Sequence, residues 1–181
     1  MSRPLITAEY ARLNAALHES NPNYGASSGR WAEVVRELSA QFASRDVLDY
    51  GCGKRRLQQA LPEFSLRHYD PGIPGLDAAP SPADIVVCTD VLEHVEPELI
   101  DHVLDDLARL TLRVGFFTVA TRPAVKVLAD GRNAHLIQQP MAWWLSRFEA
   151  CFQVVRVQDM EGLEFSILVH PLVDGPGADK A

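Results

Sequence analysis

The chain has 181 residues, of which 47% are hydrophobic and 23% are charged, and its formal net charge is -7. This composition is typical of a globular protein with a sizeable core, and no apolar stretch approaches the roughly 20 residues that a membrane-spanning helix needs. The negative charge disfavours nonspecific binding to nucleic acids. The three cysteines have no metal-ligand spacing, and the start of the chain shows no secretory pattern. We therefore expect a cytoplasmic protein with reduced thiols.

Two helices are predicted in the first part of the chain. Thr7 is a typical N-cap residue, and apolar residues recur at helical spacing from there to about Glu19. Residues 20–29 are rich in Asn, Ser and Gly and predict a loop, whereas the apolar face of residues 31–42 predicts a second helix. We expect residues 1–44 to cover the sheet and the site.

Strands and helices alternate through the rest of the chain. Six apolar segments are predicted as strands, at 47–50, 66–69, 85–89, 114–120, 152–157 and 165–170. Helices are predicted at 55–61, 97–110 and 140–148. This order predicts a three-layer α/β fold with a mostly parallel sheet. Only seven residues separate the last two strands, which is too few for a helical crossover and predicts an antiparallel closing strand.

The most informative motif is the sequence Val47-Leu48-Asp49-Tyr50-Gly51-Cys52-Gly53, a strand that ends in an acid and a Gly-x-Gly turn. Asp70 ends the next apolar run. A glycine turn lets backbone amides approach a ligand, and a carboxylate about 20 residues further on can bind a ribose diol. The pair predicts a site for a nucleoside cofactor. A dinucleotide fingerprint needs a third small residue where this chain has Arg56, so NAD is disfavoured.

A second motif, in residues 84–94, ends in Leu92-Glu93-His94. Together the two motifs resemble the class I S-adenosylmethionine-dependent methyltransferases, in which an acid precedes Gly-x-Gly and a later strand ends in a Leu-Glu-His turn. The resemblance covers about residues 30–120 and implies a Rossmann-like fold with S-adenosylmethionine as cofactor. We therefore expect one methyltransferase domain at 1–172, followed by a disordered tail at 173–181.

The resemblance also implies which residues bind the cofactor. Asp70 would hold the ribose hydroxyls, Gly51 and Gly53 would lie against the methionine part, and Asp49 would organise the turn. Other contacts are expected from the adjacent residues Tyr50, Cys52, Pro71, Thr89, Asp90 and Val91. For Asp90, a helix cap is the alternative interpretation.

The chain departs from the family pattern after Asp70. Only a short segment with four prolines separates Asp70 from Asp84, so the helix and strand usual at this point are missing or vestigial. We expect the sheet to lack a full third strand and the second strand to lie at its edge.

His94 and His135 are the candidate catalytic bases. Methyl transfer from a sulfonium mainly needs a positioned acceptor and exclusion of water, and a base only when the acceptor must lose a proton. An imidazole with an ordinary pKa near 6.5 can fill this role. We expect His135 to contact the acceptor, with a surface loop histidine as the alternative, while His94 could instead be a structural hydrogen-bonding group.

Asp90, Glu93, His94 and His135 also form a set rich in oxygen and nitrogen. It resembles the metal arrangement of the small-RNA 3′-terminal 2′-O-methyltransferases. Here the first position is Asp rather than Glu, and no RNA-end-binding module accompanies it. We therefore assign no metal to the site.

The acceptor side offers weaker signals. Trp143 could line the acceptor pocket or lie half-exposed. A cluster of basic residues could attract an anionic acceptor, or could simply be solvated; it comprises Lys54, Arg55, Arg56, Arg122, Lys126 and Arg132.

The favoured function is methyl transfer to oxygen or nitrogen of a small molecule. The alternatives are methylation of an RNA 3′ end and a catalytically silent cofactor-binding domain. Neither the acceptor nor the oligomeric state follows from the sequence, because acceptor choice depends on loops.

Overall fold

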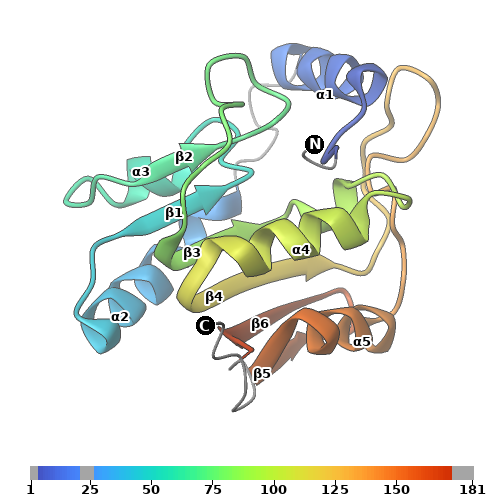
Figure 1. Ribbon diagram of the computed structural model, residues 1–181. Helices are drawn as coiled ribbons and strands as arrows, with labels where there is room; N and C mark the ends of the chain where they lie inside the picture. The colour runs from blue at the N-terminus through green and yellow to red at the C-terminus, as the bar shows by residue number, and fades with distance from the viewer. Residues whose placement is uncertain (1–3, 21–26, 173–181) are drawn as a thin grey trace, which may run out of the picture.

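The computed structural model describes residues 4–20 and 27–172, and its centre is a six-stranded sheet (Figure 1). The strands lie in the order β2-β1-β3-β4-β6-β5. Their bounds are β1 (Val47–Tyr50), β2 (Arg67–Tyr69), β3 (Ala83–Thr89), β4 (Thr111–Ala120), β5 (Phe152–Met160) and β6 (Glu164–Pro171). The expected tail at 173–181 and most of the expected loop at 20–29 lie outside the described residues.

The sheet is mostly parallel and contains one antiparallel strand. β1 pairs in parallel with both β2 and β3, and β3 pairs in parallel with β4. β6 runs antiparallel to β4 on one side and to β5 on the other. The short turn between β5 and β6 places Gly162 at a φ of +70°, a conformation that glycine adopts without strain. The predicted closing hairpin is therefore confirmed.

Helices cover both faces of the sheet and make it the middle of three layers. Figure 1 shows α4 and α5 on one face and α2 on the other. Successive strand residues alternate between the faces, so Val86 packs under α4 and α5 while Ile85 and Val87 pack with α2 and α3. The predicted three-layer fold is confirmed. The helices are α1 (Ala8–Ser20), η1 (Ser27–Trp31), α2 (Ala32–Phe42), α3 (Arg56–Ala60), η2 (Leu92–His94), α4 (Ile100–Leu110) and α5 (Met141–Cys151).

The segment between β2 and β3 contains neither helix nor strand at residues 71–82, as its prolines predicted. Proline lacks the amide hydrogen that a strand ladder needs, so β2 remains at the edge of the sheet. Arg67 ties the segment to the sheet, because its guanidinium donates to the carbonyl oxygens of Ser81 and Pro82 at 3.1 and 2.8 Å. The expectation that the sheet lacks a third strand of the usual fold is confirmed.

Several element boundaries differ from the prediction by a few residues, and hydrogen bonds accompany the changes at α4 and β4. α4 begins at Ile100 rather than Pro97, because the preceding residues form a turn in which Leu99 N donates to Glu96 O at 2.8 Å. β4 begins directly after this helix at Thr111, whose hydroxyl donates to Leu107 O at 2.8 Å. The helix and strand therefore join without a loop.

The two N-terminal helices have different roles. α2 covers the sheet, whereas α1 lies beyond the carboxyl ends of β1 and β2 (Figure 1). Thr7 caps α1 as predicted, since Tyr10 N donates to its Oγ1 at 3.2 Å. None of the helices in the described ranges is both long and apolar enough to cross a membrane.

Candidate active site

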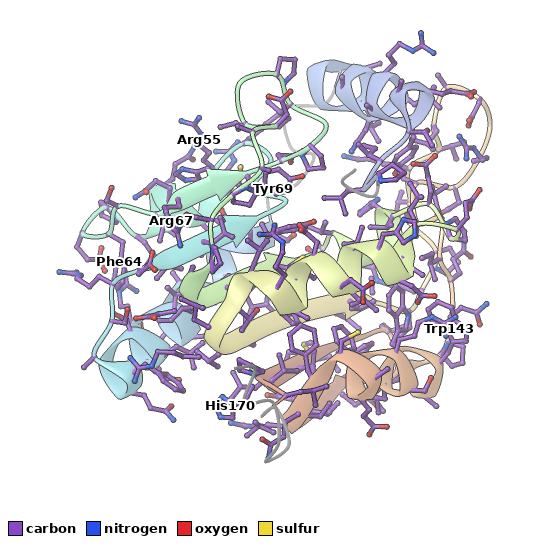
Figure 2. All side chains as sticks on the ribbon, viewed as in Figure 1. Arg55, Phe64, Arg67, Tyr69, Trp143 and His170 are labelled. Carbon is purple, nitrogen blue, oxygen red and sulfur yellow. The ribbon has the colours of Figure 1, made fainter. Side chains whose placement is uncertain are left out.

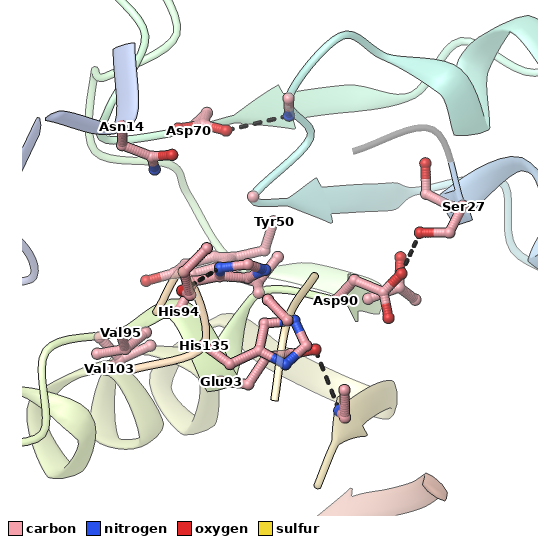
Figure 3. A pocket seen from close by; sticks show the side chains of 18 of the residues that line it. Asn14, Ser27, Tyr50, Asp70, Asp90, Glu93, His94, Val95, Val103 and His135 are labelled. Atoms are coloured by element: carbon pink, nitrogen blue, oxygen red, sulfur yellow. Dashed lines mark hydrogen bonds between the residues drawn. The ribbon is translucent and has the colours of Figure 1, made fainter. Parts of the chain in front are cut away.

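A cavity of about 460 Å³ opens at the edge of the sheet where β1, β3 and β4 end (Figure 3). Open α/β sheets bind ligands beyond the carboxyl ends of their strands, so this cavity lies where a ligand is expected. Most residues of the predicted site line it, namely Tyr50, Gly51, Cys52, Gly53, Asp70, Pro71, Thr89, Asp90, Val91, His94 and His135. Asp49 is the exception, because it is buried and does not border the cavity.

The backbone of the turn after β1 has a conformation that requires glycine at position 51. Gly51 has a φ of +74°, and a Cβ added to it would lie 2.3 Å from Val91 Cγ2, so only glycine fits there. The amides of Gly51 and Cys52 donate to Tyr69 O at 2.7 and 3.1 Å. These two amides therefore join the turn to β2, and the close approach of the turn to a ligand stays a prediction.

Asp70 is the link between the glycine turn and the segment that follows β2. Its Oδ2 accepts from Gly53 N and its Oδ1 accepts from Gly72 N, each at 3.0 Å. The two bonds fix the carboxyl group at the wall of the cavity (Figure 3). An ionised carboxylate only accepts hydrogen bonds, and each of its oxygens can accept more than one.

Asp49 lies beneath this turn with 1% of its surface exposed. Its Oδ2 has no hydrogen-bond partner among the residues that the structure describes. Burial, and then the nearby charge of Asp70, raise the pKa of Asp49 to about 7. A cation held above the turn would favour its ionised form.

Asp90 directly follows β3 and lies in the left-handed region, at a φ of +54°. Ser27 Oγ donates to its carboxylate, and Arg30 Nη2 lies 3.8 Å from it while also pairing with Glu164. Asp90 is not a side-chain cap of η2, whose N-cap residue is Val91. The contacts with Ser27 and Arg30 were not predicted, because nothing in the local sequence marks these residues as partners of Asp90.

Glu93 is fully buried on η2, although it borders the cavity. Its Oε1 accepts from Ala120 N at 3.1 Å, whereas its Oε2 has no partner among the described residues. Burial, followed by repulsion from Asp90, raises the pKa of Glu93 to about 8. The site therefore contains a carboxyl group that binds its proton unusually strongly.

His94 and His135 meet in the cavity although 40 residues separate them in the sequence. Their ring centroids are 4.8 Å apart and the rings are nearly perpendicular, at 87° (Figure 3). Backbone carbonyls fix both rings, since His94 Nδ1 lies 2.7 Å from Ala134 O and His135 Nδ1 lies 2.7 Å from Arg122 O. A ring that donates through Nδ1 presents Nε2 as an acceptor when it is neutral.

The loop that carries His135 is braced by Asn133. The side-chain oxygen of Asn133 accepts from the amides of both Ala124 and His135 at 2.9 Å, and its amide donates to Ala124 O at 2.8 Å. His135 is only 8% exposed, so the alternative of a surface loop histidine is wrong. Burial lowers the pKa of His135, which favours the neutral ring.

Glu93, His94 and His135 each offer one ligand atom within 4.8 Å of the others, a spacing that can hold a metal ion. This set contains the donor types that bind first-row transition metals. Asp90, the fourth member suggested by the sequence, is not part of the cluster, because Ser27 and Arg30 hold its carboxylate.

The expected basic residues divide into two groups. Arg122 and Lys126 line the cavity, whereas Lys54, Arg55, Arg56 and Arg132 do not. Arg132 instead bonds to Asp130 at 2.7 Å. Trp143, on α5 (Figure 2), is also absent from the cavity lining and packs against the core, with the guanidinium carbon of Arg147 3.6 Å from its ring centroid. Of the two alternatives that the sequence left open, a place at the cavity therefore holds for Arg122 and Lys126 only.

Comparisons with known proteins support the fold. The sequence matches no family model and no curated protein. The 1,6-didemethyltoxoflavin-N1-methyltransferase of Burkholderia thailandensis has a similar structure, with a TM-score of 0.64 and 18% identity over 94% of this chain and 93% of that chain. The magnesium protoporphyrin IX methyltransferase of Synechocystis PCC 6803, with bound SAH, gives a TM-score of 0.58 and 16% identity over 80% and 83%.

A putative S-adenosylmethionine-dependent methyltransferase from Listeria monocytogenes is also similar, with a TM-score of 0.54 and 13% identity over 81% of this chain and all of that chain. At these identities the likeness concerns the fold. The order of the strands, the antiparallel β6 and the cavity at the carboxyl edge agree with it. The chain therefore has the fold of the class I S-adenosylmethionine-dependent methyltransferases.

Proposed function

We propose that the protein is an S-adenosylmethionine-dependent methyltransferase that acts at oxygen or nitrogen of a small-molecule acceptor. The observation that carries this proposal is the shared cavity, which brings the glycine turn and Asp70 together with His94 and His135. The glycine turn and Asp70 would bind the cofactor, and the two histidines would contact the acceptor. Structural neighbours whose names describe O- and N-methyltransferases support the same reaction class.

The residues around the turn fit this cofactor. Gly53 N and Gly72 N fix Asp70 at the wall of the cavity, and its carboxylate is an acceptor group to which ribose hydroxyls can donate. Asp49 Oδ2 has no partner among the described residues, and positive charge in the cofactor would stabilise the ionised form of this carboxyl group. Val91 and Thr89 complete the wall on the side of β3.

The bound cofactor supplies a methyl group on a sulfonium, which is already a good leaving group. The chain therefore has to position the acceptor, exclude water and remove a proton where the acceptor carries one. We assign proton removal to Nε2 of His135, because Arg122 O holds the Nδ1 side of the ring and burial keeps the ring neutral. His94 packs edge-on against this ring and orients it.

We further propose that the acceptor is anionic. Arg122 and Lys126 are the cavity-lining cations from the loop after β4, and Arg122 contacts His135 through its backbone carbonyl. A carboxylate or phosphate bound by Arg122 would lie beside the proposed base. The positive charge would also compensate for the acidic surface of the chain.

A methyl-transfer assay tests the proposal. Labelled S-adenosylmethionine is offered with a panel of small carboxylates and phosphates beside neutral and amine acceptors, and cofactor affinity is measured by calorimetry. We expect cofactor binding and turnover confined to anionic acceptors. Absence of cofactor binding would refute the proposal, whereas binding without turnover on any acceptor would favour the catalytically silent domain.

A second candidate function is metal-assisted methylation of a hydroxyl, as at the terminal ribose of an RNA. It is favoured by the cluster of Glu93, His94 and His135, in which backbone carbonyls hold both rings and Glu93 Oε2 is buried without a described partner. A divalent cation bound there would supply positive charge near the acceptor hydroxyl. The three residues would hold the ion, and Asp90 would stay with Ser27.

Calorimetry with Mn²⁺ and Zn²⁺ separates the two candidates. Binding that is lost in His135→Ala, together with turnover on a short RNA that chelator abolishes, would favour the second candidate. Turnover on small anions that is indifferent to chelator would favour the first. Asp130→Ala, which alters an exposed carboxylate outside the cluster, is the matched control.

A further inference from the structure

Two polar side chains of α1 face the cavity and take no part in the function proposed so far. Tyr10 and Asn14 are four residues apart, so they lie on the same face of the helix, and both line the cavity. Tyr10 Oη and Asn14 Oδ1 are buried without a hydrogen-bond partner among the residues that the structure describes. Burying a polar atom without a hydrogen-bond partner costs free energy, and a bound ligand would supply the partner that these two atoms lack.

Asn14 lies next to Asp70, although α1 and β2 are far apart in the sequence. The position that a Cβ on Gly72 would occupy is 3.4 Å from Asp70 Oδ1 and 3.6 Å from Asn14 Nδ2, so both side chains border the same small space. Figure 3 shows Asn14 beside Asp70, reaching from α1 toward the loop after β2. The absence of a side chain at Gly72 keeps this space open.

A specific attachment places α1 at this position. Both carboxylate oxygens of Glu96 are used, because Thr7 N donates to Oε2 at 2.8 Å and Thr7 Oγ1 donates to Oε1 at 2.7 Å. Glu96 is only 8% exposed, so these bonds are shielded from water. Asn14 follows Thr7 by about two helical turns, or roughly 10 Å, which carries it to Asp70.

We propose that Asn14 is a cofactor-binding residue whose side-chain amide bonds the ribose hydroxyls that Asp70 also binds. This inference rests on the proposed function. As a carboxylate, Asp70 can only accept hydrogen bonds, whereas the amide of Asn14 both donates and accepts. Each ribose hydroxyl also donates and accepts, so the two side chains together satisfy a diol that either one alone leaves partly unsatisfied.

The test compares two ligands in calorimetry, S-adenosylhomocysteine and its 2′,3′-dideoxy analogue. Asn14→Ala should weaken binding of S-adenosylhomocysteine by about 3- to 10-fold, the loss expected for one or two neutral hydrogen bonds, and should change binding of the analogue by less than about 2-fold. Alanine has a higher helix propensity than asparagine, so α1 should remain intact. Arg12→Ala, at an exposed position of the same helix, is the matched control and should bind both ligands as the wild type does.

The outcomes separate this inference from the function on which it rests. Equal losses for the two ligands would indicate a merely structural effect and overturn the assignment, and so would unchanged affinity for both. If the wild-type protein binds neither ligand, the proposed cofactor is wrong and the role of Asn14 is refuted with it. A loss of affinity for S-adenosylhomocysteine but not for the dideoxy analogue would support Asn14 as the second side chain that binds the ribose diol, beside Asp70.

Discussion

The replacement of Gly51 by alanine tests the shape of the turn that forms one wall of the cavity. Two costs add in this variant. The φ of +74° is unfavourable for a residue with a Cβ, by about 1 to 2 kcal/mol. The new Cβ would lie 2.3 Å from Val91 Cγ2 and 2.8 Å from Val91 Cγ1, an overlap whose relief costs about 1 to 3 kcal/mol. We therefore expect the free energy of unfolding to fall by roughly 2 to 5 kcal/mol.

A second variant distinguishes the two costs. Val91→Ala removes both methyl groups that overlap the new Cβ, while the unfavourable φ at Gly51 stays. The double variant should therefore be less destabilised than the sum of the two single variants, by about 1 to 3 kcal/mol. The assay is urea unfolding followed by circular dichroism for the wild type, both single variants and the double variant.

Additive effects in this cycle would refute the reasoning, because they would mean that residues 51 and 91 do not touch. A Gly51→Ala variant within about 0.5 kcal/mol of the wild type would refute it as well, since surface substitutions have effects of that size. Calorimetry with S-adenosylhomocysteine on the same proteins would then report whether the cofactor wall changes with the turn.

Three further predictions concern the chemistry of the cavity. Asp70→Ala should weaken binding of S-adenosylhomocysteine by about 1 to 3 kcal/mol, because it removes hydrogen bonds to a charged group; unchanged affinity in a folded variant would exclude its contact with ribose. His135→Asn should keep cofactor affinity and lower turnover about 100-fold or more, whereas normal turnover with a strong loss in His94→Asn would assign the base to His94. Burial raises the pKa of Glu93 from 4.5 to about 8, so the folded state retains a proton that the unfolded chain releases, and stability falls as the pH rises through this window. Glu93→Gln should therefore lose less unfolding free energy than the wild type between about pH 5 and pH 8. The measurement is urea unfolding at several pH values, and an equal pH dependence of the unfolding free energy in the two proteins would contradict this prediction.

The sequence was sufficient for the elements of the fold. Apolar runs of strand length and apolar helical faces are local patterns, and they identified all six strands and the covering helices with small errors at their ends. The prolines at 71–82 correctly indicated the missing third strand, because a residue without an amide hydrogen disfavours a ladder wherever it lies. The position of Asp70 at the end of β2, beside the glycine turn, also followed from the motif.

Predictions that depended on the direction of exposed side chains were less accurate. Lys54, Arg55 and Arg56 follow β1, and this position suggested a place beside the ligand, yet none of the three lines the cavity. Trp143 was equally ambiguous, since adjacent helical positions point in different directions and the sequence does not say which one faces the site.

The tertiary structure alone decided how distant segments meet around the cavity. Ser27 bonds to Asp90 across 63 residues and Arg30 to Glu164 across 134, and no local pattern connects them. The pairing of His94 with His135, and of Asn14 with the surroundings of Asp70, likewise depends on where α1 and the loop after β4 pack. Periodicity and turn chemistry act over a few residues, so the sequence by itself determined the strands, the helices and the cofactor-side motif. Packing of the whole chain decided which polar groups share the site, because such contacts form only when separate elements dock on the sheet.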